Sequence, residues 1–282
     1  ADVNRIREDG VTFRSVVDGS AMHLTPERAI EIQCDLGADV IMAFDQCPAD
    51  PLKRDDVAVA TERTHRWLDR CVTRWQELGG LDRGQALFGI VQGGCFEDLR
   101  RASVAAVTSH DLVGYALGGI SVGEGRAAIR DAFAFATPLL PVDKPRYLMG
   151  IGTPVDFFDA VAEGADLFDC VTPTRHGRNH QGFTSRGRVN LRNLAWALET
   201  GPLDPECACP ACTRYPAGAL RHLCTVGEML GGTLLSIHNL YFFHSLMARI
   251  RAAVAAGRLA ELRAEVLPRV EQRFKPGAAE AE

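Results

Sequence analysis

Cys207, Cys209 and Cys212 lie within six residues of one another in the segment Pro205–Pro216. Their C-x-C-x2-C spacing lets three thiolates occupy one face of a tetrahedral zinc ion, which leaves one corner for a nitrogen or a fourth sulfur. We expect His238 to fill that corner, because it is a single imidazole in an otherwise apolar helical segment. Four protein ligands would make the zinc structural, whereas three would leave an open catalytic position. The alternative fourth ligands are His222, His244 and Cys224.

The segment from Cys170 to Leu198 contains several basic residues and no Asp or Glu. Exposed surfaces ordinarily mix the two signs, so an acid-free segment in a chain of net charge −5 favours local contact with a phosphate-bearing partner. The side chains that could make this contact are Arg175, His176, Arg178, His180, Arg186, Arg188 and Arg192.

The composition is that of an ordinary globular protein, with 46% hydrophobic and 24% charged residues in 282 positions. This length fits one large domain or two small ones. No leader and no apolar run of about 18 residues is visible, so we expect a cytoplasmic protein that does not cross a membrane. Thiols stay reduced in that compartment, which favours metal binding over disulfides for the clustered cysteines.

Five segments share one design, in which a short apolar run ends in a polar residue or glycine and an amphipathic stretch follows. Apolar strands that alternate with helices predict a parallel sheet covered on both faces. A (β/α)8 TIM-type barrel fits this alternation better than a doubly wound sheet, because no G-x-G-x-x-G follows the first strand. The five expected strands are Asp39–Cys47, Ala86–Gly94, Leu112–Gly119, Pro145–Gly152 and Asp166–Pro173.

Polar residues and glycines stand at the carboxyl ends of these expected strands, which form the catalytic face of a barrel. A carboxylate beside a carboxamide suits the edge of a purine, since Asp accepts hydrogen bonds and Gln both donates and accepts. Glycine lets the backbone approach a flat ligand closely. The strand-end residues are Asp45, Gln92, Gly119, Gly150 and Asp169.

The remainder of the chain lacks the strand–helix alternation. The residues 10–20 and 182–190 each predict a hairpin, and the segment 189–193 is a candidate for a sixth barrel strand. We therefore expect a barrel portion over 1–198, a zinc subdomain with C-terminal helices over 199–274 and a frayed tail over 275–282.

Six motifs, in the order and spacing of one family, identify a resemblance that runs from Val11 to about Arg273. They are "MAFDQC", "FGIVQGG", "ALGGISVGEG", "YLMGIGTP", "FDCVTPTRHGRNHQGF" and the cysteine set "CACPAC" followed by a histidine. With these motifs the chain resembles the bacterial tRNA-guanine transglycosylases, the queuine tRNA-ribosyltransferase family. That family has a (β/α)8 barrel with a zinc subdomain.

The resemblance implies a role for each matching position. Asp169 would be the nucleophile that attacks the ribose of the wobble guanosine. Asp45, Cys47, Gln92 and Gly119 would bind the base, and Met149 would pack on it. Cys207, Cys209, Cys212 and His238 would close a structural zinc site. The RNA-binding residues would be Gly150, Ile151, Gly152, Thr153, Pro154, Val155, Asp156, Thr174, Arg175, His176, Gly177 and Arg178.

The resemblance also implies the substrates and partners. The tRNAs would be those with G-U-N anticodons, which accept Asp, Asn, His and Tyr, and the product would belong to queuosine biosynthesis. Cys47 and Val122 match members that insert 7-aminomethyl-7-deazaguanine. A homodimer is expected, although the aromatic positions after the cysteines are only partly matched.

The family also has an N-terminal segment with a second aspartate for acid–base chemistry, and this sequence begins beyond it. We therefore expect the 282 residues alone to express poorly and to show little or no base exchange, and roughly a hundred upstream residues to restore both. The competing interpretations are an inactive fragment, a non-catalytic zinc protein that binds tRNA as a partner subunit, and a metal-dependent barrel hydrolase. Retention of Asp45, Gln92 and Asp169 favours the enzyme over the partner subunit, and the lack of strand-end histidines disfavours the hydrolase.

Overall fold

The structure is a computed structural model that describes residues 4–48, 50–120, 123 and 125–276 of the chain. Its contacts divide the chain into two compact units. The first contains Ala1–Ile151 and Glu163–Asp169, and the second contains Gly152–Ala162 and Cys170–Glu282. The boundary at residue 198 between the barrel portion and the zinc subdomain stays a prediction. None of the described helices is long and apolar enough to span a bilayer.

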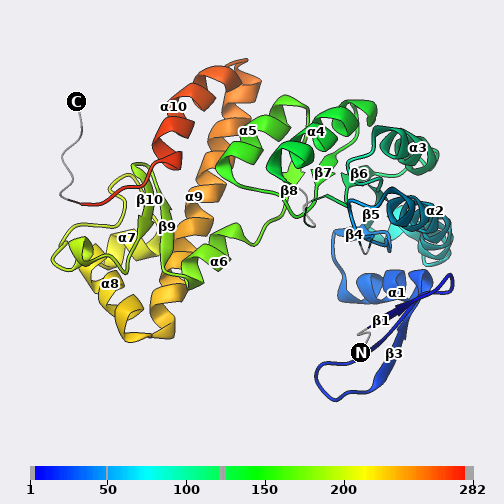
Figure 1. Cartoon of the computed structure of the whole chain (residues 1–282), viewed down its shortest axis with the longest axis horizontal. Coiled ribbons are helices and arrows are strands. Elements are labelled where there is room, and N and C mark those ends of the chain that lie inside the picture. The colour runs from blue at the N-terminus through cyan, green and yellow to red at the C-terminus, as the bar shows by residue number, and fades with distance from the viewer. Residues whose placement is uncertain (1–3, 49, 121–122, 124, 277–282) are drawn as a thin grey trace. The chain divides into compact units, whose positions relative to one another are not determined.

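A parallel five-stranded sheet forms the centre of the first unit, with the strand order β4-β5-β6-β7-β8 (Figure 1). Each strand pairs with the next one along the chain, as in the register Val40↔Ala86 between β4 and β5. This sheet confirms the predicted barrel-type α/β fold, with these five strands among the described residues. The strands are β4 (Val40–Met42), β5 (Ala86–Val91), β6 (Gly114–Leu117), β7 (Arg146–Leu148) and β8 (Leu167–Phe168).

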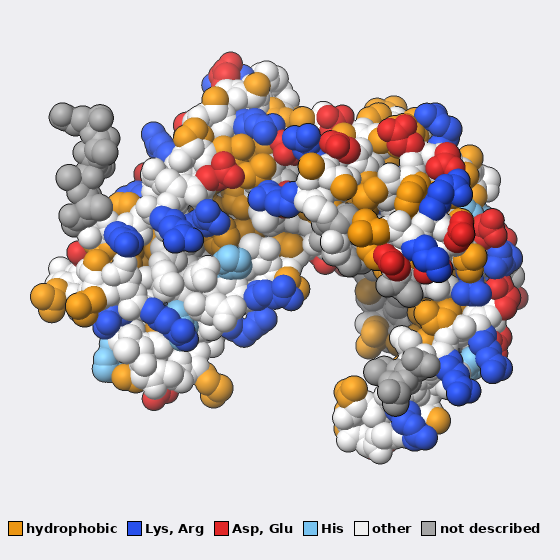
Figure 2. Space-filling view, in the orientation of Figure 1, with side chains coloured by type: hydrophobic (Ala, Val, Ile, Leu, Met, Phe, Trp, Pro, Cys, Tyr) orange, Lys and Arg blue, Asp and Glu red, His pale blue; other side chains and the backbone are white. Residues whose placement is uncertain are grey.

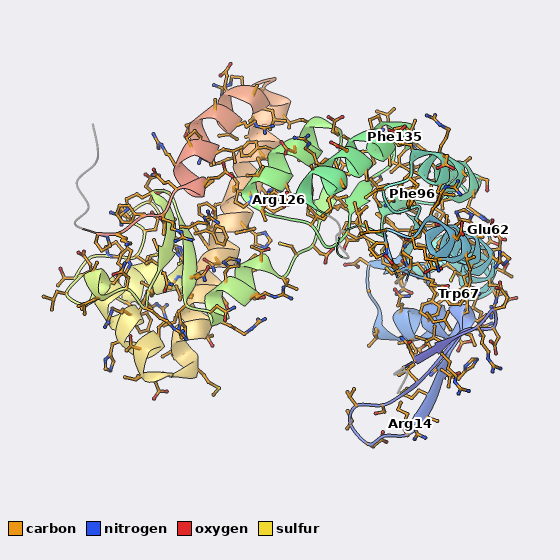
Figure 3. All side chains as sticks on the ribbon, viewed as in Figure 1. Arg14, Glu62, Trp67, Phe96, Arg126 and Phe135 are labelled. Carbon is orange, nitrogen blue, oxygen red and sulfur yellow. The ribbon has the colours of Figure 1, made fainter. Side chains whose placement is uncertain are left out.

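Three helices separate the first four strands, as the amphipathic stretches predict. They are α2 (Arg54–Glu77), α3 (Glu97–Thr108) and α4 (Arg126–Ala136). β5 is covered on both faces, so its side chains from Leu87 to Val91 are buried, which is why its sequence is a continuous apolar run. Trp67 of α2 is fully buried and belongs to the same core (Figure 3).

A three-stranded antiparallel sheet precedes β4 and confirms the predicted opening hairpin. It consists of β1 (Asn4–Ile6), β2 (Val11–Arg14) and β3 (Ala21–Leu24). The helix α1 (Pro26–Leu36) follows, and its start is encoded by Thr25, whose side chain caps the N–H of Arg28 at 3.2 Å. The sheet is attached to α2, where Trp67 donates to the Glu8 carbonyl at 2.8 Å.

The second unit is built on one long helix, α9 (Met229–Ala255). The short helix α6 (Thr172–Arg178) packs closely on it, because a Cβ at Gly177 would lie 2.5 Å from the Ser236 hydroxyl. Glycine is therefore needed at position 177 for the two helices to meet. The other helices are α5 (Pro154–Ala162), α7 (Pro210–Arg214), α8 (Ala217–Val226) and α10 (Leu259–Glu271).

A hairpin of β9 (Gln181–Thr184) and β10 (Gly187–Asn190) also belongs to this unit. The predicted hairpin is confirmed, but the candidate sixth barrel strand at 189–193 is wrong. Val189 pairs with Gly182 in the antiparallel two-stranded sheet, so β10 does not join the parallel sheet. Its alternating pattern of buried and exposed residues is that of a hairpin with one face on a core.

An ion pair joins α1 to α2 in the first unit and gives a pH-dependent contribution to stability. Arg70 binds both oxygens of Glu27, at 2.6 and 2.7 Å, and this contact lowers the pKa of the Glu27 carboxyl to about 2. A lowered folded-state pKa stabilises the fold above pH 4.5, and the contribution disappears as the pH falls from 4.5 toward 2.

We predict that Glu27→Gln lowers the free energy of unfolding by about 1 kcal/mol at pH 7, a value reduced because the pair is one-third exposed. Denaturant unfolding at pH 7 and at pH 3 measures this, and the gap to wild type should narrow at the lower pH. Glu62→Gln on the exposed face of α2 is the matched control (Figure 3) and should change little. An equal loss in both variants, or a gap independent of pH, would contradict the assignment.

Candidate functional site

The carboxyl edge of the parallel sheet carries every strand-end residue that the sequence singled out. Parallel strands end at the same edge, so the five loops that follow β4 to β8 start there. The structure divides their side chains into two hydrogen-bonded groups. One group forms after β4, β5 and β6, and the other forms after β7 and β8.

Asp45 and Gln92 form the first group. The Gln92 amide nitrogen donates to the Asp45 Oδ2 at 2.6 Å, and the Gln92 Oε1 is buried without a hydrogen-bond donor among the described residues. Gly119 lies against this amide, because a Cβ there would come within 2.0 Å of the Gln92 Oε1. Its φ of +64° is also a conformation that favours glycine. The group therefore offers a carboxylate and an unsatisfied acceptor beside bare backbone, which suits a flat ligand with N–H groups.

Burial controls the ionisation of this group. Desolvation raises the pKa of the Asp45 carboxyl, and the hydrogen bond from Gln92 opposes that rise. Desolvation likewise raises the pKa of the Cys47 thiol, with a contribution from the Asp45 charge, while a backbone hydrogen bond from Gly119 lowers it. Cys47 thus lies with the other three predicted base-binding residues. Val122, which the resemblance paired with it, lies outside the described residues.

The loop that carries Asp45 is fixed to α2 on both sides of the carboxylate. Phe44 stacks on Trp67 with ring centroids 4.9 Å apart, and the N–H of Gln46 donates to the Thr64 hydroxyl at 3.0 Å. Anchors at 44 and 46 leave Asp45 little freedom to turn away from Gln92. This restraint favours a binding role over that of a mobile surface carboxylate.

Asp169 forms the second group, at the end of β8. Its Oδ1 accepts hydrogen bonds from the Tyr147 hydroxyl and the Gly150 N–H, both at 2.7 Å. The Asp169 carboxylate is exposed. Burial of the Tyr147 hydroxyl, and then its hydrogen bond to Asp169, raise the pKa of Tyr147 above its usual range. Met149 follows β7 between these two donors and is half-buried, with its N–H on the Leu117 carbonyl. The arrangement leaves the Asp169 Oδ2 as the oxygen available to a reaction partner.

Arg100 is a functional residue that the sequence analysis missed. Its buried guanidinium donates to the carbonyls of Val91, Gly94 and Gly118, at 2.8 to 3.0 Å, and so joins the ends of β5 and β6. A signal was available, because position 100 shares the helical period of Ser103, Val104 and Val107 on the buried face of α3. Tyr147 was missed too, and its sequence gave no comparable signal.

In the expected RNA-binding segment 150–156, most side chains are buried or bonded to other residues of the same segment. Thr153 caps α5, and its N–H and hydroxyl donate to the Asp156 carboxylate at 2.9 and 2.6 Å. Ile151 and Pro154 are buried, Gly152 packs on Cys170, and Val155 is half-buried. The accessible polar groups of this segment are therefore mainly backbone.

The segment 174–178 is different, because the side chains of its two arginines are exposed. Arg175 and Arg178 are exposed on α6, and no acidic partner is found for either among the described residues. His176 packs on the Phe183 ring, Gly177 packs on α9, and the Thr174 hydroxyl bonds the Val171 carbonyl. Arg175 and Arg178 are thus the residues of this segment that can reach an anion.

Cys207, Cys209, Cys212 and His238 form a cluster in the core of the second unit, with ligand atoms all within 4.8 Å of one another. The three sulfurs lie 3.4 to 3.6 Å from the His238 Nδ1. The His238 Nε2 bonds the Phe183 carbonyl at 2.8 Å, which places the proton on Nε2 and leaves Nδ1 as a ligand. The cluster can therefore hold a metal ion. Of the four alternatives, the structure selects His238.

The comparisons with known proteins agree with this geometry. The family model of queuine tRNA-ribosyltransferase matches residues 1–272. The chain belongs to the queuine tRNA-ribosyltransferase family. A queuine tRNA-ribosyltransferase of Halothermothrix orenii is 48% identical over 95% of this chain and 70% of its own length. The one of Novosphingobium aromaticivorans is 48% identical over 94% of this chain and 71% of its own length. The one of Desulfosudis oleivorans is 49% identical over 93% of this chain and 68% of its own length. The resemblance stated from the motifs is confirmed.

We predict that the purified chain carries about one metal ion and that His238→Ala loses it, since a four-ligand site without its nitrogen cannot close. Elemental analysis and thermal unfolding measure the two consequences, loss of metal and a lower Tm. His222→Ala removes an exposed histidine of α8 and should keep the metal. Full metal content in His238→Ala would contradict the ligand set.

Proposed function

We propose that this chain replaces guanine at the wobble position of tRNA with a 7-deazaguanine-type base, through a covalent intermediate on Asp169. The observation that carries the proposal is the pairing of two carboxylate groups at one sheet edge. Asp45 with Gln92 forms a carboxylate–amide group that suits the edge of a purine, and Asp169 is held by two donors on one of its oxygens. Family membership supports the same reaction, because its relatives are named queuine tRNA-ribosyltransferases.

Base recognition would use the polar atoms that the first group leaves open. An ionised Asp45 accepts hydrogen bonds from the N–H groups of a guanine edge, and the unsatisfied Gln92 Oε1 accepts another. Glycine at 118 and 119 keeps side chains away from the plane of the base. Cys47 lies beside the site, where it would line the space for the substituent at position 7. Together with Val122 it favours 7-aminomethyl-7-deazaguanine as the incoming base.

The chemistry is a double displacement at the ribose anomeric carbon. A bond forms between the Asp169 Oδ2 and C1′ as the glycosidic bond to guanine breaks, and guanine leaves with the electron pair and takes up a proton. The incoming base then attacks C1′ through its ring nitrogen, loses its proton and releases Asp169. Two inversions restore the original configuration, and ATP is not needed. Tyr147 and the Gly150 N–H would keep the carboxylate oriented through both steps.

The RNA would be held through its phosphates. The target nucleotide must leave the stack of the loop to reach Asp169. The exposed Arg175 and Arg178 can hold flanking phosphates, and the segment 150–156 can contribute backbone N–H groups. G-U-N anticodons, and hence the tRNAs for Asp, Asn, His and Tyr, are the proposed substrates, with a homodimer as the working form.

The metal proposed for the Cys3His cluster is zinc in a structural role. A tetrahedral zinc with bonds of about 2.3 Å to sulfur and about 2.0–2.1 Å to nitrogen separates its S and N ligands by roughly 3.5 Å. The sulfur-to-Nδ1 distances of 3.4 to 3.6 Å fit that geometry. Four protein ligands fill the coordination sphere, so the ion supplies stability and no chemistry.

We predict that Asp169→Asn abolishes the covalent adduct with a G-U-N stem-loop RNA, because the amide is a poor nucleophile. The wild-type chain should form an adduct that survives denaturing electrophoresis after long incubation. RNA binding should persist in the variant, since the basic residues are unchanged. Asp143→Asn, an exposed carboxylate on the loop before β7, is the matched control. A measurable adduct of equal yield in wild type and Asp169→Asn would contradict the proposal.

We predict that Asp45→Asn weakens guanine binding about ten- to a hundredfold, because the amide presents donors to the N–H groups of the base. Calorimetric titration with guanine measures this. Wild-type binding should also weaken on acidification at a pH above the usual range for Asp, because the pKa of Asp45 is raised and the protonated form loses an acceptor. Asp39→Asn, at the opposite end of the same strand, controls for charge loss. Unchanged affinity in Asp45→Asn would make this carboxylate purely structural.

A further inference from the structure

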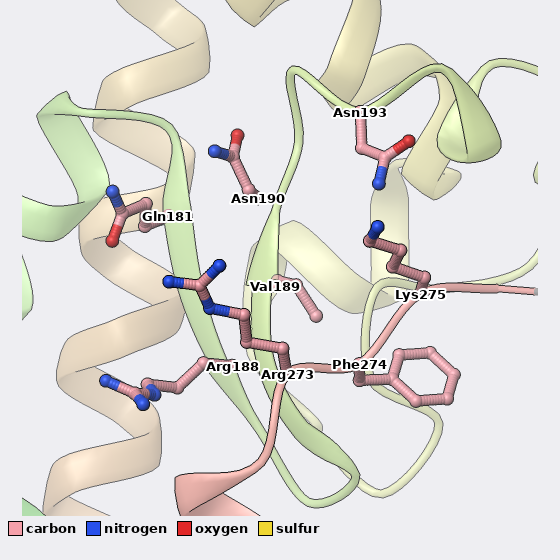
Figure 4. A pocket seen from close by; sticks show the side chains of 8 residues that line it. All are labelled: Gln181, Arg188, Val189, Asn190, Asn193, Arg273, Phe274 and Lys275. Carbon is pink, nitrogen blue, oxygen red and sulfur yellow. The ribbon is translucent and has the colours of Figure 1, made fainter. Parts of the chain in front are cut away.

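A cavity of about 330 Å³ lies in the second unit, between the β9–β10 hairpin and the segment that follows α10 (Figure 4). The chain after α10 is joined to β10 through hydrogen bonds between Arg188 N and the Gln272 carbonyl, at 2.8 Å, and between Phe274 N and the Arg188 carbonyl, at 2.9 Å. Backbone hydrogen bonds between β10 and the segment after α10 therefore hold the two walls of the cavity together. Its lining residues are Gln181, Arg188, Val189, Asn190, Asn193, Arg273, Phe274 and Lys275.

The polar groups that this cavity presents are mostly hydrogen-bond donors. The Asn190 Oδ1 accepts from the Arg192 N–H at 3.0 Å, and the Asn193 Oδ1 accepts from the Ala195 N–H at 3.1 Å. Both amide oxygens are thus engaged by backbone, which leaves their NH2 groups to the cavity. In Figure 4 the Lys275 ammonium points toward the Asn193 amide. A lining of ammonium, guanidinium and amide donors suits the oxygens of a phosphate.

Among the described residues, no acidic side chain neutralises these cations. Asp and Glu are absent from the lining, and the described residues include no ion-pair partner for Arg273 or Lys275. Arg188 uses one nitrogen on the Glu271 carbonyl, and Arg186 stacks on the Phe274 ring at 4.2 Å. Figure 2 displays Lys and Arg side chains gathered over this part of the second unit. The cations are therefore available for an external anion.

The cavity also explains a sequence feature that the catalytic groups do not use. Gln181 to Asn193 all fall in the acid-free segment from Cys170 to Leu198, and β9 begins three residues after Arg178 of α6. The Leu191 N–H bonds the His180 carbonyl, so the two ends of this stretch meet. The basic surface of α6 and the cavity are consecutive parts of one chain segment.

We propose that this cavity binds a phosphodiester group of the RNA backbone, at a nucleotide separate from those held by α6. The inference rests on the proposed function, because it takes the RNA to be the substrate tRNA. Arg273 and Lys275 would bind the phosphate, and the Asn190 and Asn193 amides would donate to it or to a neighbouring ribose hydroxyl. RNA fits the mixture better than a free phosphate does, because amides beside cations match a sugar–phosphate strand.

The test compares tRNA binding by the 282-residue chain and an Arg273→Gln/Lys275→Gln variant, over a salt range of about 50 to about 200 mM. Each lost phosphate contact reduces the salt slope by about 0.7 to 0.9, so we expect a loss of roughly 1.5. Affinity at the lower salt concentration should fall about tenfold or more. Arg251→Gln/Arg258→Gln removes two exposed arginines of the same unit and should change both quantities far less.

Asn190→Asp provides a second variant that is safer for folding. It keeps the Oδ1 that accepts from the Arg192 N–H and replaces the free amide by a negative oxygen in the cavity. We expect it to weaken tRNA binding at least as much as loss of one cation, with an unchanged Tm.

Three outcomes would overturn the inference. One is a salt slope and affinity in both cavity variants equal to those of the arginine control. Another combines two results: millimolar inorganic phosphate raises the Tm of wild type but not of the cavity variants, and the cavity variants bind tRNA as wild type does. This combination would assign the cavity to a small anion. The third is wild type that binds no tRNA. If wild type forms the Asp169 adduct and the cavity variants bind tRNA normally, this inference fails and the proposed function stands.

Discussion

The buried guanidinium of Arg100 holds the recognition end of the parallel sheet together. A parallel ladder ends where its strands end, and the loops beyond it have no regular hydrogen-bond partners of their own. Arg100 supplies partners to three carbonyls, from Val91, Gly94 and Gly118, across the ends of two strands. Each such bond to a charged group contributes about 1.5–3 kcal/mol, and loss of the donor would leave buried carbonyls unsatisfied. Arg100 fixes the spacing between Gln92 and Gly119 together with the Gly118 N–H, which donates to the Val91 carbonyl at 3.0 Å.

Close packing at this end of the sheet also leaves two polar groups of the site, on Gln92 and Asp45, in energetically unfavourable surroundings. Gln92 carries a buried oxygen with no donor among the described residues, and burial raises the pKa of Asp45. Under the proposed function, a ligand with N–H groups would remove both costs, which would favour a base that carries those groups over one that lacks them. Glycine at 119 makes the arrangement possible, because any Cβ would collide with the Gln92 amide. Under the proposed function, specificity would therefore arise from close packing around these polar groups.

The sequence predicted those features that chain order or local spacing encodes. The five strands, Asp45, Gln92 and the C-x-C-x2-C motif were found because periodicity and short-range spacing are local properties. Arg100 was missed since an arginine in an amphipathic helix usually faces solvent, and its three acceptors become neighbours only after folding. Tyr147 was missed because its partner, Asp169, is 22 residues away and follows another strand, so the two meet only after folding. The segment 189–193 was wrongly considered a barrel strand because its length fits a strand of either kind, and only the pairing of Val189 with Gly182 places β10 in the hairpin.

The metal cluster, which takes no part in the proposed chemistry, still determines the shape of the basic surface. His238 joins the three sulfurs through Nδ1 and bonds the Phe183 carbonyl through Nε2, so a bound ion fixes α9 to β9. The next residue, Asn239, accepts from the Phe183 N–H at 3.0 Å and donates to the carbonyls of Pro173 and Gln181 at 2.9 and 3.0 Å. Two consecutive residues of α9 thereby hold both α6 and the first strand of the cavity wall. Loss of the ion would free the His238 ring from the three sulfurs and so remove one of the contacts that hold α6 and β9 on α9, beside those of Asn239 and of Gly177 with Ser236. A metal ion bound at this cluster would in this way help to position, from the interior of the unit, the basic surface to which the proposed function assigns the RNA.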